Sequence, residues 1–140
     1  MVGDPIADMV NRIKTAGNAL QDSIVVPFSK IKFEIAKVLK TEGFIKSVQV
    51  LDEDKVGVSK KLEIGILYKL QAKTSDKKIP KINEVVRVSK FSRRVYTPIS
   101  ALYSILGGRG IAVLSTTKGI LSDKMARREK IGGEYLLKIW

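Results

Sequence analysis

The chain has 140 residues and a mass of 15.5 kDa, and 44% of its residues are hydrophobic, which predicts one sizeable core or two small modules sharing an interface. Its formal net charge of +12 indicates a polyanionic partner, and no run approaches the roughly 20 apolar residues that a membrane-spanning helix needs. Because the chain contains no cysteine and no histidine, disulfides, a Ser-His-Asp triad, a cysteine nucleophile and the usual zinc sites are excluded.

Residues 1–70 predict an α/β module with the element order α-β-α-β-β. Asp4 and Pro5 are typical of a helix N-cap and first helical position. Apolar residues follow at helical spacing, and Gly17 is the expected end of this helix. A short strand over residues 23–28 comes next, and its proline favours a sheet edge.

The second predicted helix follows Ser29 as its cap, with Phe28 packing on Phe33 across the helix start. The residues expected to form its buried face are Ile31, Ile35, Val38 and Leu39. Two strands, near residues 44–51 and 62–69, complete the module.

The remainder of the chain predicts a linker and a second module. Residues 71–81 contain lysines and a proline and predict a basic linker. Residues 82–140 predict a smaller, mostly β module with a short helix over residues 100–106 and a turn of helix after Asp123. The strands expected in this module cover residues 83–89, 94–97, 110–115, 119–122 and 134–139. The whole chain is therefore predicted to be an α+β protein.

Positive charge is concentrated in the second half of the chain. Residues 1–68 carry a net charge of +1, whereas residues 69–94 carry +7 and residues 109–140 carry +4. A polyanion is therefore expected to bind mainly through the second half. One alternative is a basic scaffold that binds acidic proteins or anionic membranes through residues 69–94. Another is a small hydrolase, which would need a cofactor that no motif in the sequence indicates.

One apolar strand of the second module ends in three consecutive hydroxyl residues, a lysine and a glycine. Ser115, Thr116 and Thr117 can each donate and accept hydrogen bonds, so a tight turn of them suits the edge of an unpaired base or a ribose hydroxyl. Lys118 supplies a cation for phosphate, and Gly119 lets the backbone turn. The same residue types are also typical of a turn that only connects two strands.

Basic residues beside an aromatic form a second candidate. Arg93 and Arg94 can pair with phosphate in a bidentate manner, and Tyr96 offers a ring for stacking on a base or ribose. The same segment also fits a strand in which Tyr96 covers the edge of the core.

In the first module, Arg12 and Lys14 lie off the apolar stripe of the first helix and face either a partner or solvent.

A third candidate contains two glycines and a carboxylate. Gly132 and Gly133 permit close backbone approach, and Glu134 can accept from a base amino group or brace the hydroxyl residues; a hairpin with a surface glutamate is the alternative.

Residues 107–110 lack the spacing and terminal Lys-Ser/Thr of a P-loop. Residues 115–118 match only the Ser-x-x-Lys element of penicillin-binding enzymes, so we expect no catalytic residues.

Three separated motifs, in order, resemble the family of the eighth protein of the small ribosomal subunit. They are Asp4-Pro5-Ile6-Ala7-Asp8-Met9, Lys40-Thr41-Glu42-Gly43-Phe44-Ile45, and residues 110–119 followed by Asp123 and Gly132-Gly133-Glu134. The resemblance implies a non-enzymatic, primary rRNA-binding protein that binds a helix of the central domain of small-subunit rRNA and supports subunit assembly. It also implies a place in cytoplasmic ribosomes beside other small-subunit proteins. No cofactor, metal, membrane or small-molecule substrate is expected.

The resemblance also assigns roles to individual residues. In this family the hydroxyl residues contact an irregular internal loop of the RNA helix, which implies the same role for Ser115, Thr116 and Thr117. The first module is expected to add contacts through Lys30 and Lys32, since backbone N–H groups at a helix N-terminus favour phosphate.

Overall fold

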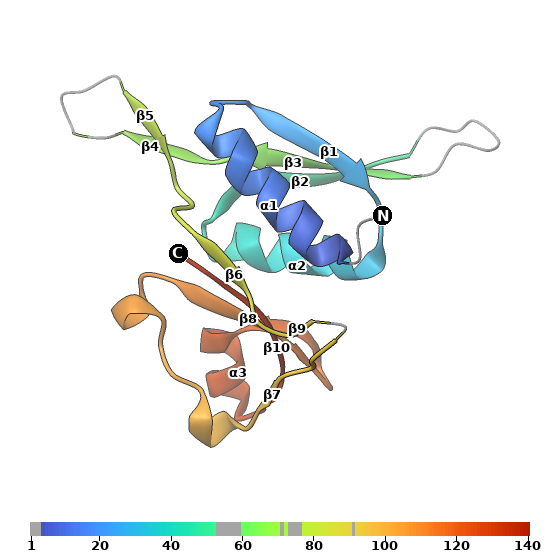
Figure 1. Cartoon of the computed structure of the whole chain (residues 1–140), viewed down its shortest axis with the longest axis vertical. Helices are drawn as coiled ribbons and strands as arrows, with labels where there is room; N and C mark the ends of the chain where they lie inside the picture. The colour runs from blue at the N-terminus through green and yellow to red at the C-terminus, as the bar shows by residue number, and fades with distance from the viewer. Residues whose placement is uncertain (1–3, 53–59, 71, 73–76, 91) are drawn as a thin grey trace.

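The computed structural model describes residues 4–52, 60–70, 72, 77–90 and 92–140, and it shows two α/β units stacked along the long axis (Figure 1). The helices α1 and α2 lie between the N-terminal sheet and the C-terminal unit. Helices and antiparallel sheets are mixed, as an α+β protein requires. No helix of the described residues is long and apolar enough to cross a membrane. Residues 71 and 73–76 of the predicted linker lie outside the described residues.

Helix α1 spans Pro5–Asn18, and it begins as its sequence predicts. The Asp4 carboxylate accepts a hydrogen bond from the Ala7 backbone N–H at 3.2 Å, which satisfies one of the free donors of the first turn. The helix does not end at Gly17, which is buried inside its last turn. A Cβ on Gly17 would lie 3.1 Å from the Cβ of Pro80, so the glycine serves close packing here and does not end the helix.

Helix α2 spans Lys30–Thr41, with Ser29 as its cap and the rings of Phe28 and Phe33 6.0 Å apart at its start. The expected buried face is wrong at one position, because Ile31 is 40% exposed and its neighbour Lys32 is buried. The Lys32 ammonium donates to the Pro27 carbonyl at 3.3 Å, so its apolar stem lies inside while its charge is held by a strand end.

The N-terminal sheet is antiparallel, with the order β1-β3-β2. Its strands are β1 (Ser23–Pro27), β2 (Ile45–Leu51) and β3 (Lys61–Ile66), and β1 forms an edge as predicted from its proline. The strand expected over residues 62–69 is divided at Leu67. Beyond it, β4 (Tyr68–Leu70) pairs with β5 (Lys78–Pro80), so the described part of the predicted linker contains a strand.

The C-terminal sheet has the order β6-β10-β8-β9, with β7 also paired to β10. Its elements are β6 (Val85–Arg87), β7 (Tyr96–Thr97), β8 (Ile111–Thr116), β9 (Gly119–Ser122), α3 (Asp123–Glu129) and β10 (Gly133–Ile139). The helix expected over residues 100–106 is wrong. Two 3-10 turns, Ile99–Ala101 and Leu106–Gly108, stand there instead. Ile99, Leu102 and Ile105 all pack on one apolar cluster, but the backbone is extended at Leu102 and Ile105, which interrupts the predicted helix.

The two units share one hydrophobic core. Ile111 and Val113 on one face of β8 belong to the same cluster as the buried residues of α1, α2 and the N-terminal sheet. Ala112 and Leu114, on the other face, pack with α3 and the 3-10 turns. Two ion pairs also join α1 to the strand β6 region, Lys14 with Glu84 at 2.5 Å and Asp4 with Arg87 at 2.8 Å. These contacts fix the orientation of one unit on the other.

Candidate nucleic-acid interface

The start of β10 lies between the end of β8 and the short strand β7 (Figure 1). Glu134 is in register with Ser115 on one side and with Tyr96 on the other, and Gly133 is in register with Thr97. Three segments that lie far apart in the sequence, residues 93–96, 115–119 and 132–134, therefore form one surface. We call this surface the strand-end patch.

Gly132 and Gly133, at the start of β10, allow this close approach. A Cβ on Gly133 would lie 3.0 Å from the Ser115 carbonyl carbon and 3.1 Å from the Thr116 Cγ2, and closer still to the Ser115 carbonyl oxygen. A Cβ on Gly132 would overlap the carbonyl oxygen of Thr97 in the same way. Neither glycine has a positive φ, so the requirement comes from space between backbones and not from a left-handed conformation.

The hydroxyl turn, residues 115–119, uses one of its three hydroxyls internally. The Thr116 hydroxyl donates to the Gly119 carbonyl at 2.8 Å and accepts from the Lys118 backbone N–H at 3.1 Å. Gly119 has a φ of +106°, which favours glycine. Within the described part of the chain, the hydroxyls of Ser115 and Thr117 have no hydrogen-bond partner, so both remain available to a ligand.

Helix α3 holds the β8–β9 hairpin at both of its ends. At the start of the helix, the buried Asp123 carboxylate accepts from the Ala112 backbone N–H of β8 at 3.1 Å. At the end, the Glu129 carboxylate lies 2.9 Å from the Lys118 ammonium. The hydrogen bond and charge of Lys118 hold the pKa of Glu129 below its ordinary value. The lysine of the hydroxyl turn is thus already paired, and a phosphate would have to share it with Glu129.

A buried network behind the patch contains a residue that sequence reasoning missed. The Ser89 hydroxyl is fully buried, donates to the Glu134 carboxylate at 2.5 Å and accepts from the Val95 backbone N–H at 3.1 Å. The Arg94 guanidinium donates to the same carboxylate at 3.0 Å. Glu134 thus braces the β7 side of the patch rather than the hydroxyl turn. The available signal was a serine among the valines of a predicted strand, since a buried hydroxyl needs a partner.

The charge of Glu134 is stabilised by this network. Burial alone would raise the pKa of Glu134, but the hydrogen bonds from Ser89 and Arg94, with the charges of Arg94 and Arg87, outweigh it. The pKa of Glu134 therefore lies below its ordinary value. An ionised Glu134 thus holds the Arg94 guanidinium beside β10.

The aromatic ring of the patch faces outward. Tyr96 is 70% exposed, so it does not cover the edge of the core. Arg93 and Arg94 are exposed as well, and Val95, between Arg94 and Tyr96, is half-buried. The segment therefore presents the Tyr96 ring and the Arg93 side chain to the outside, while the Arg94 guanidinium is paired with Glu134.

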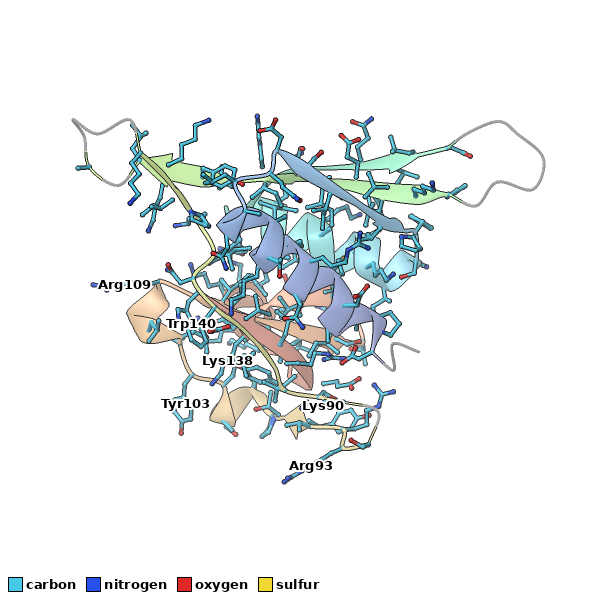
Figure 2. All side chains as sticks on the ribbon, turned by 45° about the horizontal axis from the view of Figure 1, so that its top comes forward. Lys90, Arg93, Tyr103, Arg109, Lys138 and Trp140 are labelled. Carbon is cyan, nitrogen blue, oxygen red and sulfur yellow. The ribbon has the colours of Figure 1, made fainter. Side chains whose placement is uncertain are left out.

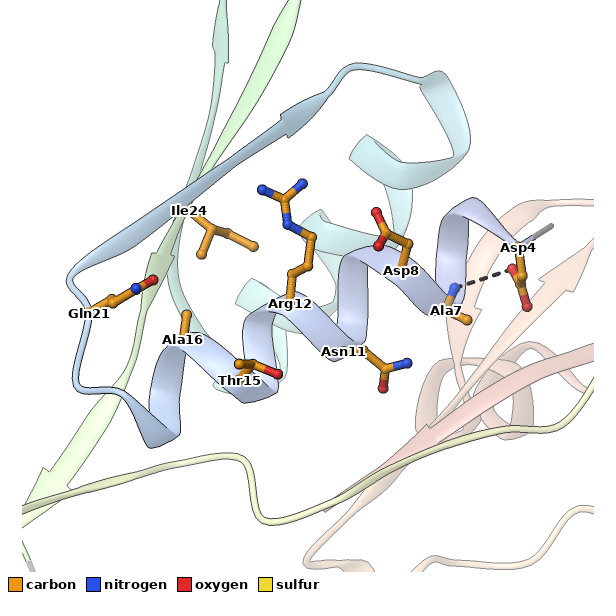
Figure 3. A pocket seen from close by; sticks show the side chains of 9 residues that line it. All are labelled: Asp4, Ala7, Asp8, Asn11, Arg12, Thr15, Ala16, Gln21 and Ile24. Atoms are coloured by element: carbon orange, nitrogen blue, oxygen red, sulfur yellow. Dashed lines mark hydrogen bonds between the residues drawn. The ribbon is translucent and has the colours of Figure 1, made fainter. Parts of the chain in front are cut away.

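The candidates in the first unit lie in different places. Lys30 is exposed at the start of α2 and lines a shallow recess together with Gly119, so it lies beside the hydroxyl turn. Arg12 extends from α1 toward β1, where it donates to the Val25 carbonyl at 3.1 Å (Figure 3). Lys14 is paired with Glu84, and Lys32 is buried. Of these four side chains, the recess beside the hydroxyl turn includes Lys30 alone.

Comparison with known proteins gives a consistent result. Residues 4–140 match the family model described as Ribosomal protein S8. A protein of Caldicellulosiruptor bescii named small ribosomal subunit protein uS8 is 42% identical over 137 residues, which cover 98% of this chain and 97% of the relative. A protein of the same name from Petrotoga mobilis is 39% identical over 140 residues, which cover all of this chain and 100% of the relative. Another, from Mycoplasmopsis pulmonis, is 42% identical over 140 residues, which cover all of this chain and 98% of the relative.

Proposed function

Since the chain belongs to the ribosomal protein S8 family, whose members are structural, non-enzymatic components of the small ribosomal subunit, we propose that it binds small-subunit rRNA directly through the strand-end patch. The RNA target is a helix of the central domain, and binding supports assembly of the subunit. The protein acts within cytoplasmic ribosomes beside other small-subunit proteins.

The observation that carries this proposal is the convergence of available hydroxyls with exposed cations and a ring. Ser115 and Thr117 present hydroxyls that are free to donate and accept among the described residues. Glu134 of β10 lies between Ser115 and the exposed Tyr96, and the exposed Arg93 precedes Tyr96 by three residues. Hydroxyls match base edges and 2′-hydroxyls, guanidinium groups match phosphates, and an exposed ring stacks on a base or ribose. One surface thus offers a group for each part of a nucleotide.

The kind of RNA follows from the geometry of A-form helices. Their major groove is deep and narrow, so short side chains reach only the shallow minor groove or the bases of an irregular loop. Hydroxyls held at the end of a sheet strand are short and rigid, which favours an internal loop over a regular duplex. The Lys30 side chain beside Gly119 extends the positive surface toward the flanking phosphates.

A binding measurement with matched RNAs tests the proposal. The full chain is titrated with a central-domain hairpin that carries the internal loop and with a scrambled hairpin of equal length, over a series of salt concentrations. We expect a gap in affinity that persists at high salt, because hydrogen-bond readout is less sensitive to salt than phosphate attraction. Convergence of the two curves at high salt would favour the basic scaffold and overturn the proposal.

Substitutions separate readout from charge. Ser115→Ala is expected to reduce the discrimination between the two hairpins by about 1–3 kcal/mol, because a hydrogen-bonding group of the complex loses its partner. Ser104→Ala removes another exposed hydroxyl from the same unit and should leave discrimination unchanged. Equal losses by Ser115→Ala on both hairpins would contradict a role of this hydroxyl in recognition.

A further inference from the structure

A second positively charged site lies at the opposite end of β8 from the hydroxyl turn. Lys69, Lys81, Asn83, Arg109 and Trp140 line a common recess, which we call the cationic recess. Arg109 comes just before β8, and Trp140 follows Ile139 of β10, which is in register with the first residue of β8. Figure 2 shows Arg109 and Trp140 near one end of the C-terminal unit and Arg93 near the other. Since a strand rises about 3.3 Å per residue, β8 separates the two sites by roughly 20 Å.

The cations of the recess come from three separate segments and remain available. Lys69 lies on β4, Lys81 follows β5, and Arg109 follows the second 3-10 turn. No carboxylate side chain is part of the lining, and no carboxylate of the described residues lies within 4.0 Å of these three cationic groups. The Lys81 ammonium lies 5.6 Å from the centre of the Phe44 ring, which orients it without neutralising it.

The wall of the recess is held in place by backbone hydrogen bonds. A main-chain carboxylate oxygen of Trp140 accepts from the backbone N–H groups of Asn83 at 2.6 Å and Glu84 at 3.0 Å, and the Trp140 N–H donates to the Glu84 carbonyl at 3.0 Å. The indole is half-buried, and the Asn83 side-chain amide is exposed next to it. The recess therefore combines a half-buried indole, an amide donor and three cations, beside the main-chain carboxylate of Trp140, which is held by two backbone N–H groups.

We propose that the cationic recess binds the phosphodiester backbone of a second, single-stranded segment of RNA. Lys and Arg side chains contact phosphate oxygens, the amide donates to phosphate or sugar, and an indole offers a surface for stacking that tolerates any base. This inference rests on the proposed function, because a protein bound to rRNA through its strand-end patch would expose the recess to neighbouring RNA. The chain then joins two RNA segments across the length of β8.

The chain contains a built-in reporter for this site. Trp140 is its single tryptophan and lines the recess, whereas the strand-end patch lies at the other end of β8. The full chain is titrated with a twelve-nucleotide oligouridylate while tryptophan fluorescence is recorded. We expect saturable quenching, which Ser115→Ala leaves intact because that residue lies in the other site.

Charge variants test the residues. The triple variant Lys69→Gln, Lys81→Gln and Arg109→Gln is compared with a matched control, Lys37→Gln, Lys60→Gln and Lys61→Gln, which removes three exposed cations from outside the recess. The recess variant should bind oligouridylate about 10-fold more weakly than the control, and the slope of log K against log salt should fall by about 2, as expected for three lost single-strand phosphate contacts.

The outcomes separate this inference from the function on which it rests. Unchanged tryptophan fluorescence, equal losses in both triple variants, or tighter quenching by a polyglutamate peptide than by oligouridylate would each overturn the cationic recess as an RNA site. The last result would assign the recess to an acidic protein segment. The hairpin measurement with Ser115→Ala reports on the strand-end patch alone, so the failure of either site is recognised independently of the other.

Discussion

Substitution of Gly133 by alanine tests the close packing of β10 on β8, on which the strand-end patch depends. The new methyl group would lie 3.0 Å from the Ser115 carbonyl carbon and closer to its oxygen, where a carbon-to-oxygen contact needs about 3.3–3.6 Å. The two backbones must therefore separate by roughly 1 Å. Because both atoms belong to the main chain, no rotation of a side chain relieves the overlap.

The expected loss of stability combines two effects. Overpacking of a well-packed site lowers the free energy of unfolding by about 1–3 kcal/mol. Weakening a ladder hydrogen bond between Gly133 or Glu134 and its neighbours adds about 1 kcal/mol. We therefore expect Gly133→Ala to lower stability by about 2–4 kcal/mol. With a urea dependence of about 2 kcal/mol per molar, the unfolding midpoint falls by roughly 1–2 M.

RNA binding distinguishes this mechanism from ordinary glycine strain. Gly107→Ala is the control: its φ is +64° and the added methyl meets no atom within 4 Å, so it should lose about 1–2 kcal/mol from backbone strain alone. The control should keep full discrimination between the two hairpins, whereas Gly133→Ala should lose it. A Gly133→Ala protein that unfolds at the wild-type midpoint and retains discrimination would refute the packing argument.

Substitutions at three further positions test other parts of the patch. Ser89→Ala should lower the free energy of unfolding by about 1–3 kcal/mol in urea titrations, because Glu134 and the Val95 N–H each lose a partner; wild-type stability would contradict the network. Thr116→Ser should keep the turn intact, whereas Thr116→Val should lose about 1 kcal/mol and weaken hairpin discrimination; identical behaviour of the two would contradict the role of its hydroxyl. Glu134→Gln tests the pH dependence of stability. The pKa of Glu134 is lowered in the folded state, so its ionised form stabilises the fold above the unfolded-state pKa of 4.5. This stability is lost as the pH falls from 4.5 through the lower folded-state pKa. Urea midpoints measured from neutral pH to well below 4.5 should therefore fall more for wild type than for the variant, and parallel curves would contradict this assignment.

Local chemistry explains which elements were predictable from the sequence. The start of α1 depends on Asp4 and Pro5, and the start of α2 on Ser29, all of which act within one helical turn. The β8–β9 hairpin likewise depends on the conformation of Gly119, which its own sequence indicates. Such features need no knowledge of the rest of the chain.

The mistaken positions depend on neighbours distant in sequence or on irregular structure. Lys32 is buried because Pro27, at the end of an adjoining strand, offers a carbonyl to its ammonium. Residues 100–106 contain apolar residues that suit a helix, yet Leu102 and Ile105 pack on the cluster around Leu114 from an extended backbone. The partner of Ser89 is 45 residues away, and only the strand register brings them together.

The shared core has a consequence for the proposed recognition of RNA. A hydroxyl distinguishes partners only if its position is fixed, because a mobile side chain loses entropy on binding and adapts to the wrong ligand as well. Ser115 lies at the end of a strand whose preceding residues are buried between the two units, and α3 restrains the same hairpin through Asp123. The pairing of Lys14 with Glu84 further fixes α1 to the second unit. We therefore infer that the first unit serves the proposed recognition by immobilising the hairpin as well as by placing Lys30 beside it.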